Sequence, residues 1–513
     1  MPKKAEAYWP LILLLAIIKF VLPLFLQSDY YELQRDELLY YQQGQHLSFG
    51  FLENPSMLSL LAGISSLFGG SEAWIKLWPC LFGAGTLILA CLIAAECGGG
   101  IFAQFLAGLS VMSGAFIRSH FLFQPVMLEI FCWTLALYFL VRYIRDKDTF
   151  SIYGLALSLA LGWWAKYSVL FLVAGIVVAL LLTKHRRIFI RKHLWLAALT
   201  ATLLILPNIW WQYLHNWPLV HHMKELKETQ LQYVSPFEFL EDQLMMLFVV
   251  VYVWVAGLVY SVRWRDLVPL PIVFITVIAL LVLGQGKSYY SLGLYPALLG
   301  AGGAAIEKLF TRYTWMNYVI TAYILFLGIR TAPILLPYWE PERLARYYKN
   351  DVFGRTAGRV WEDHKEHDLP QDFADMTGWR ELSQKAERVF LGLPDSVKAA
   401  TMIFCDNYGQ AGALKYYGKD KLFRERVISA SGSFLLWMPE RLSFKHLLYI
   451  HTPEPDSDRR LFALFTSVTV RDSVTNTYSR QFGNQVIVLQ NSMPGADSLV
   501  SGAMKERRHR FTR

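Results

Sequence analysis

The feature that most constrains the fold of this chain is a series of long apolar runs that recurs from its start to Leu336. A helix needs roughly 20 mostly apolar residues to cross the hydrocarbon core of a bilayer. The first run, Ala7–Leu26, meets this length and is preceded by Lys3 and Lys4. Because the run lacks a small-residue cleavage site, we expect a retained membrane helix rather than a removed signal peptide.

Composition excludes a string of soluble domains. Of the 513 residues, 54% are hydrophobic and 15% are aromatic, whereas only 17% are charged. The net charge is +9, but Lys and Arg collect in short loops between apolar runs rather than on one periodic face. Membrane topology explains this pattern better than a nucleic-acid partner does. The five cysteines form no close-spaced pair, so neither a disulfide framework nor a zinc site is expected.

Positive charge orients the predicted spans. Lys3 and Lys4 place the N-terminus in the cytoplasm, and the basic connection Lys184–His193 falls on the same side. Pro55–Gly69 is too short to cross easily, so we expect a re-entrant or interfacial helix at the outer surface. The sequence predicts about eleven spans. They are Ala7–Leu26, Trp74–Glu96, Ile101–Ile117, Pro125–Ile144, Tyr153–Trp164, Val169–Leu182, Leu194–Tyr213, Leu244–Val262, Leu267–Leu283, Leu292–Leu309 and Trp315–Leu336.

An odd number of spans places residues 337–513 outside the membrane. This part is charged, has soluble-type alternation and contains no further run long enough to cross. The predicted fold class is mainly α, with a polytopic helical membrane domain over residues 1–336 and an extracytoplasmic α/β domain over 337–513. The basic end, Lys505–Arg513, is expected to be disordered or to contact anionic lipid headgroups. The predicted strands are Met402–Cys405, Leu447–His451, Leu461–Thr469 and Gln485–Leu489, and the predicted helices include Ser383–Leu391 and Gly409–Tyr417.

Polar side chains collect in the predicted external loops. The stretch Ser28–Ser56 follows the first span and carries the adjacent carboxylates Asp36 and Glu37 among tyrosines. A carboxylate opposite Lys and Arg at a membrane surface suits a reaction in which an anionic lipid headgroup leaves, because the cations neutralise the phosphate while the carboxylate takes a proton. The other candidates on this side are Arg118, His120, Lys166, Tyr167, His221, His222, Lys287, Tyr289 and Tyr290.

Short motifs in these loops form a recognisable set. They are Arg35-Asp36-Glu37 with Tyr40-Tyr41, Glu53-Asn54-Pro55-Ser56, Phe123-Gln124-Pro125, Lys166-Tyr167-Ser168, and Lys287 followed by a Tyr-rich run. Together they resemble GT-C membrane glycosyltransferases of the protein O-mannosyltransferase and aminoarabinose transferase group. The resemblance touches nearly the whole chain.

The resemblance implies a GT-C fold and an inverting transferase. Such an enzyme moves a sugar from a polyprenyl-phosphate donor to a protein, lipid or glycan acceptor at the outer face of a bacterial inner membrane. It implies that Asp36 is the catalytic base, that Glu37 orients it or a basic neighbour, and that Lys166, Lys287 and Arg118 hold the leaving phosphate. No cofactor is required by this chemistry, which also admits a divalent metal between Asp36 and phosphate. Further substrate contacts are expected from Arg35, Tyr40, His120, Glu129, Tyr167, Tyr289 and Tyr290.

Two positions depart from the family pattern. Val126 stands where an Asp often follows the proline, and Glu53-Asn54-Pro55-Ser56 stands where Asp-His-Pro-Pro is frequent. The second acid of the site is therefore Glu129, one helical turn beyond Val126, or Glu53.

Other interpretations compete with the enzyme. A transporter or lipid flippase also has many spans, but such proteins place ionisable groups near the bilayer midplane, often in two repeated halves, and no repeat is visible here. Individual residues also have structural alternatives. Lys166 can be an interfacial anchor beside aromatic residues. Glu129 can pair with Lys19, and His221-His222 can be loop polarity without a metal.

Overall fold

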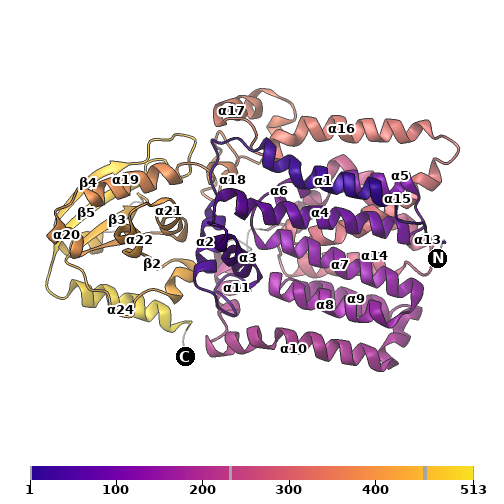
Figure 1. Ribbon diagram of the computed structural model, residues 1–513, viewed down its shortest axis with the longest axis horizontal. Helices are drawn as coiled ribbons and strands as arrows, with labels where there is room; N and C mark the ends of the chain where they lie inside the picture. The colour runs from indigo at the N-terminus through magenta and orange to yellow at the C-terminus, as the bar shows by residue number, and fades with distance from the viewer. Residues whose placement is uncertain (1–2, 230–233, 357, 454–458, 512–513) are drawn as a thin grey trace.

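The computed structural model describes residues 3–229, 234–356, 358–453 and 459–511. A bundle of helices forms one end of the molecule and a mixed sheet covered by helices forms the other (Figure 1). The helices α2 (Arg35–Gln45), α3 (Met57–Leu67) and α11 (Pro218–Thr229) lie between the two (Figure 1). The N-terminus lies at the end of the bundle farthest from the sheet.

The described part of the bundle contains each of the predicted apolar runs in helical form. Besides α2, α3 and α11, the helices of this part are α1 (Trp9–Leu26), α4 (Glu72–Glu96), α5 (Ile101–Val111), α6 (Phe116–Ser119), α7 (Pro125–Asp146), α8 (Thr149–Ala165), α9 (Val169–Leu181), α10 (Lys192–Leu214), α12 (Pro236–Met245), α13 (Val251–Arg263), α14 (Pro269–Leu283), α15 (Tyr295–Leu309) and α16 (Trp315–Leu335). The 3₁₀ turns η1 (Lys184–Ile190), η3 (Phe248–Val250) and η4 (Ser288–Leu294) connect some of them.

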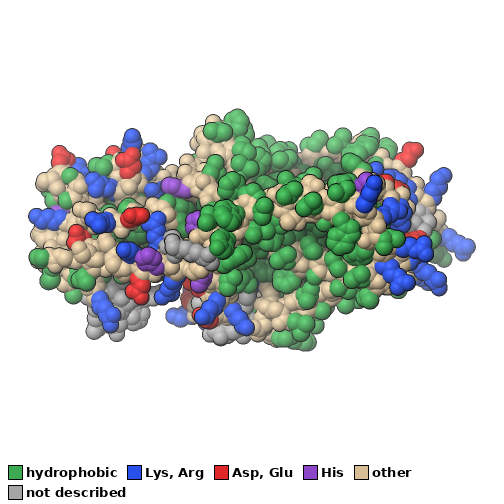
Figure 2. Space-filling model, turned by 90° about the horizontal axis from the view of Figure 1, so that it is seen from below, with side chains coloured by type: hydrophobic (Ala, Val, Ile, Leu, Met, Phe, Trp, Pro, Cys, Tyr) green, Lys and Arg blue, Asp and Glu red, His purple; other side chains and the backbone are tan. Residues whose placement is uncertain are grey.

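The helices differ in whether they can cross a membrane alone. Among the described residues, 5 helices are long and apolar enough, namely α1, α4, α7, α10 and α16, and the count rises to 7 if two bent pairs are each one span. The shorter apolar helices α5, α8 and α14 fall below that length. The predicted total of about eleven spans therefore stays a prediction. Hydrophobic side chains cover the middle of the bundle, and Lys and Arg gather at its far end (Figure 2), so the chain is a polytopic membrane protein.

Glycines bring the central helices close together. A Cβ on Gly302 of α15 would lie 1.9 Å from the carbonyl oxygen of Val253 in α13, and one on Gly303 would lie 2.4 Å from that of Ala103 in α5. Small residues at such crossings let backbones approach and gain dispersion contacts that lipid does not provide. At the end far from the sheet, Glu96 pairs with Lys4 at 2.5 Å and with Arg145 at 2.9 Å.

The part after α16 is built on a five-stranded sheet. The strand order is β2-β1-β3-β5-β4, with β1 parallel to β2 and β3, and β5 antiparallel to β3 and β4. The strands are β1 (Thr401–Cys405), β2 (Val427–Ser429), β3 (His446–His451), β4 (Phe465–Ser473) and β5 (Gln485–Ser492). The helices are α17 (Pro341–Asn350), α18 (Gln371–Ala374), α19 (Trp379–Leu391), α20 (Asp395–Ala399), α21 (Tyr408–Tyr417), α22 (Lys421–Glu425), α23 (Arg459–Phe462) and α24 (Ala496–His509), with the 3₁₀ turns η5 (Gly354–Thr356) and η6 (Gly432–Leu436).

This mixed sheet agrees with the predicted α/β class, with two corrections. The strand expected from Leu461 begins only at Phe465, because α23 precedes it, and β2 was not predicted. The basic end is also not disordered over its described residues, because α24 continues to His509. The predicted domain boundary at 336/337 lies one residue beyond the end of α16 and remains a prediction.

Contacts with backbone amides join the part of the chain after α16, called the sheet part below, to the segment between α1 and α2. The Glu32 carboxylate accepts hydrogen bonds from the backbone N–H of Trp379, at 2.7 Å, and of Arg380, at 3.1 Å. These two amides belong to the first turn of α19 and have no acceptor within the helix, so a carboxylate is favoured there. Burial nevertheless raises the pKa of Glu32 to about 7. Glu72 of α4 binds the Arg380 guanidinium at 2.5 Å and the Tyr417 hydroxyl at 2.9 Å.

Candidate active site

A cavity of about 1260 Å³ lies where the bundle meets the sheet part. It receives side chains from α2, from the turns before α7 and η4, from α11 and from the C-terminal helix α24. The predicted site residues that line it are Arg35, Asp36, Tyr40, Arg118, Lys166, Lys287, Tyr289 and Tyr290, together with Glu53, His221 and His222. Loops that are far apart in the sequence therefore meet at one surface of the bundle.

Asp36 is fixed on the wall of this cavity by the start of α2. The Gln34 side chain accepts from the backbone N–H of Asp36 at 2.7 Å, and the Glu37 carboxylate accepts from the backbone N–H of Gln34 at 2.8 Å. Such a reciprocal capping box anchors the first helical turn. The Asp36 Oδ1 accepts from the Tyr408 hydroxyl at 2.7 Å, and Oδ2 accepts from the Gln124 amide at 3.2 Å. The side chain remains 26% exposed, so it can meet a substrate.

Glu37 lies outside the cavity, although we predicted it as a catalytic residue. Both of its carboxylate oxygens lie 2.7 Å from the Lys76 ammonium, and one accepts from the backbone N–H of Phe123 at 2.6 Å. Both members of the pair are buried. These contacts hold α2 against α4 and the turn before α7. Moving α2 away would leave a buried charge without its partner, which is costly.

Lys166 and Lys287 provide positive charge at the cavity. Lys166 binds the Glu129 carboxylate at 2.9 Å, and its ammonium lies 3.6 Å from the centre of the Tyr290 ring. The Lys287 ammonium has no hydrogen-bond or ion-pair partner within the described ranges of the chain. Of these two lysines, Lys166 is therefore shared with Glu129, whereas Lys287 is free to pair with an anion that enters the cavity.

Glu129 and Glu53 differ in their access to the cavity. Glu129 is buried beneath Lys166 and does not line the cavity, and the alternative pairing with Lys19 is wrong, because Lys19 donates to the backbone oxygen of Phe116. Glu53 lines the cavity and accepts from the backbone N–H of Ser433 at 2.7 Å. Burial raises the pKa of Glu53. Of the two candidates for a second acid, Glu53 is the one that a substrate can reach.

Arg118 lines the cavity, whereas two of its predicted companions do not. The Arg118 guanidinium pairs with Asp372 and lies 5.6 Å from the ring centre of Phe373. His120 is buried in the bundle, and neither of its ring nitrogens has a partner among the residues that the structure describes. The Tyr167 hydroxyl accepts from the Gln212 amide at 2.8 Å and serves packing. We predicted substrate contacts for His120 and Tyr167, but the structure places both outside the cavity wall.

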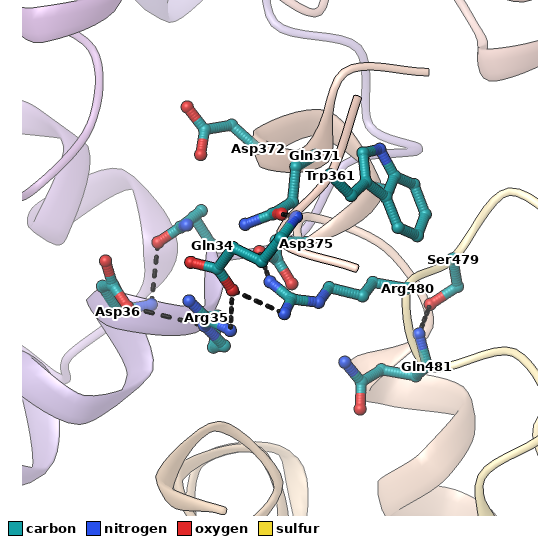
Figure 3. Close-up of polar contacts among 12 residues, drawn as sticks. Gln34, Arg35, Asp36, Trp361, Gln371, Asp372, Asp375, Ser479, Arg480 and Gln481 are labelled. Atoms are coloured by element: carbon teal, nitrogen blue, oxygen red, sulfur yellow. Dashed lines mark hydrogen bonds and ion pairs between the residues drawn. The ribbon is translucent and has the colours of Figure 1, made fainter. Parts of the chain in front are cut away.

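A network of ion pairs also connects the sheet part to Arg35 at the start of α2. Figure 3 shows Arg35 and Arg480 converging beside Asp375. The guanidinium groups of Arg35 and Arg480 lie 3.7 Å and 2.7 Å from the same carboxylate oxygen of Glu362, and Arg480 also binds Asp375 at 3.1 Å. Burial raises the pKa of Asp375 to about 6 although both arginines favour its charged form. Sequence reasoning missed this network and Tyr408, because no local pattern signals contacts between such distant segments.

The described residues of the cavity do not form a ready-made metal centre. Within the part of the chain that the structure describes, no group of three or more His, Cys, Asp or Glu side chains is arranged to hold a metal ion. His221 and His222 both line the cavity, but His221 lies 3.3 Å from the Asn216 amide and packs against Phe511 of the C-terminal segment. Both histidines belong to the helix α11 rather than to an irregular loop.

Comparisons with known proteins support the fold. Residues 53–211 match the model of the dolichyl-phosphate-mannose-protein mannosyltransferase family. The lipid A galacturonosyltransferase RgtD of Rhizobium johnstonii is 30% identical over 195 residues, which are 37% of this chain and 41% of that protein. The match thus spans less than half the length of this curated relative.

Solved structures match over nearly the whole chain. The crystal structure of ArnT from Cupriavidus metallidurans bound to undecaprenyl phosphate has a TM-score of 0.58 and 13% identity, and the match covers 94% of this chain and 98% of ArnT. The apo state of the same protein gives a TM-score of 0.57 with 14% identity, covering 93% and 97%. The chain therefore has the GT-C fold of these solved structures, and its residues 53–211 are similar to the dolichyl-phosphate-mannose-protein mannosyltransferase family.

Proposed function

We propose that this protein transfers a sugar from a polyprenyl-phosphate donor to an acceptor hydroxyl or phosphate at the outer face of a bacterial inner membrane. The observation that carries the proposal is the single cavity that holds the accessible carboxylate of Asp36 together with the unpaired ammonium of Lys287. A base and an anion-binding group on one wall are what displacement of a lipid phosphate requires. The N-terminus is then cytoplasmic and the sheet part extracytoplasmic.

Asp36 acts as the base in the proposed reaction. Its carboxylate takes the proton of the acceptor oxygen, which forms a bond to the anomeric carbon from the face opposite the phosphate. The bond between that carbon and the phosphate oxygen breaks, its electron pair stays on the polyprenyl phosphate, and the configuration inverts. Lys287, with Lys166 and Arg118, neutralises the departing phosphate. Tyr408 and Gln124 hold the two carboxylate oxygens of Asp36 in place.

Two similarities support the proposed classes of donor and acceptor. ArnT has been solved with undecaprenyl phosphate, which supports a lipid phosphate in this cavity. RgtD is named for transfer to lipid A, which favours a lipid among the protein, lipid and glycan acceptors. We propose that the activated phosphodiester needs no cofactor, although a divalent metal between Asp36 and phosphate is compatible with the same chemistry.

Replacement of Lys287 tests whether the donor is a polyprenyl-phosphate sugar. In vesicles that contain the full-length protein and a labelled polyprenyl-phosphate sugar, we expect Lys287→Ala to lower kcat/KM by roughly 10- to 100-fold, because one hydrogen bond to a charged group is lost. The exposed Lys349 provides a matched control as Lys349→Ala, which should transfer like the wild type. Use of a nucleotide sugar in place of the lipid donor would contradict the proposal. Movement of lipid across the bilayer without sugar release would favour the flippase instead.

Replacement of Tyr408 tests whether its hydrogen bond to Asp36 contributes to catalysis. Tyr408→Phe removes the donor to Asp36, so we expect kcat to fall by roughly 10- to 100-fold with little change in KM for the donor. Tyr318→Phe, on the exposed face of α16, is the control. An unchanged kcat would remove Tyr408 from the mechanism.

A further inference from the structure

A second cavity, of about 620 Å³, lies on the other side of α2 from the candidate active site. Asp36 and Tyr40, four residues apart, line the first cavity, whereas Tyr41 and Gln45 line the second. Residues four apart share a helix face, and successive residues point about 100° apart. The two cavities are therefore separated by one helix, and the described lining of the second contains none of the residues assigned to transfer.

Three cations and one acid surround the second cavity. Lys415 of α21 and Lys421 and Arg424 of α22 contribute the cations, and Glu425 contributes the acid. Lys421 lies 3.8 Å from Glu425, but these side chains are 84% and 60% exposed, so their pair is weak. The Arg424 guanidinium has no partner among the described residues. The balance of charge favours an anionic ligand.

Exposed apolar side chains lie next in sequence to the lining of the same cavity. Gly69 and Gly70 line it directly after the end of α3, where Leu67 is 83% exposed and Phe68 stacks on Trp74 at 4.9 Å. Exposed apolar residues beside membrane helices, with an aromatic ring among them, are typical of the boundary between hydrocarbon and headgroups. The cavity thus has positive charge on the sheet part and an apolar edge on the bundle.

We propose that the second cavity binds the headgroup of an anionic membrane lipid. Its phosphate meets Lys415, Lys421 and Arg424, and its acyl chains lie over Leu67 and Phe68. This inference does not depend on the transferase activity. A lipid bound here contacts the turn between α3 and α4 as well as α21 and α22, so it stabilises the docked arrangement of the two parts by mass action.

The test uses the full-length protein in a neutral detergent. Binding and thermal stability are measured with short-chain phosphatidylglycerol, with phosphatidylcholine of the same chain length, and with inorganic phosphate. We expect phosphatidylglycerol to raise Tm more than either of the others. The double variant Lys421→Gln/Arg424→Gln should weaken phosphatidylglycerol binding by roughly 30-fold, since each surface cation contributes to attraction of an anionic lipid.

The matched control is the double variant Arg441→Gln/Lys445→Gln, which removes the same charge from exposed positions outside the cavity. It should bind phosphatidylglycerol like the wild type. Equal loss of binding in both double variants would overturn the site. An equal effect of phosphatidylcholine would overturn the anionic class, and an equal effect of inorganic phosphate would reduce the cavity to a site for a free anion. Each variant changes exposed side chains, so the fold is expected to persist.

Discussion

Asp36→Asn should abolish most sugar transfer while leaving the donor bound. Asn keeps the size of the side chain and one acceptor oxygen for the Tyr408 hydroxyl, but it cannot take a proton from the acceptor. General-base catalysis by a positioned carboxylate contributes roughly 10²- to 10⁴-fold. We therefore expect kcat to fall by that factor in the polyprenyl-phosphate sugar assay, with donor affinity changed by no more than about threefold.

The control for Asp36 is Asp395→Asn. Asp395 is exposed at the start of α20, pairs only with Lys398 in the described structure and does not line the cavity. Its replacement should leave transfer unchanged. Turnover within a few-fold of the wild type in Asp36→Asn would move the base elsewhere, and Glu53, the candidate second acid on the cavity wall, would then be replaced by Gln in the same assay.

Lys76→Met should destabilise the protein more than the loss of any exposed ion pair. Lys76 and Glu37 are both buried, and the loss of the ammonium leaves the Glu37 carboxylate without its countercharge. Breaking a buried pair from one side costs about 3–5 kcal/mol. We expect a corresponding loss in the free energy of unfolding, measured with denaturant on detergent-solubilised protein, together with reduced transfer because α2 carries Asp36.

A double variant separates the charge from the packing. Lys76→Met/Glu37→Leu removes both charges, so it should recover part of the lost stability, although the backbone N–H of Phe123 then lacks its acceptor. Lys398→Met breaks an exposed pair and should cost less than about 1 kcal/mol. If Lys76→Met is as mild as Lys398→Met, the Glu37 pair does not anchor α2.

The sequence was sufficient to predict that side chains from distant loops meet at one place. Asp36, Lys166 and Lys287 lie in three distant loops, but counting apolar runs and basic connections assigned them to one face, and the structure places them around one cavity. The mixed α/β character of the C-terminal part was visible in the sequence, since β1, β3 and β5 each contain a short apolar run. The three-residue β2 carries too short a pattern to be predicted.

The direction of individual side chains was not predictable. Asp36 and Glu37 are neighbours in sequence, yet a helix turns them about 100° apart, so one meets the cavity and the other meets Lys76. His120 and Tyr167 were predicted to contact substrate, but both side chains turn into the packing of the bundle. The contact of Tyr408 with Asp36 joins segments 372 residues apart, and a single sequence provides no sign of such a pairing.

The short helix α2 separates the two cavities, and a capping box fixes the start of its 11 residues. A helix of this length moves as one body, so a displacement of one face of α2 also displaces the opposite face. If the second cavity binds an anionic lipid as proposed, its occupancy on the Tyr41 flank should change the distance between Asp36 and an incoming acceptor. The turnover of the protein would in that case vary from one bilayer to another with donor and acceptor concentrations held constant.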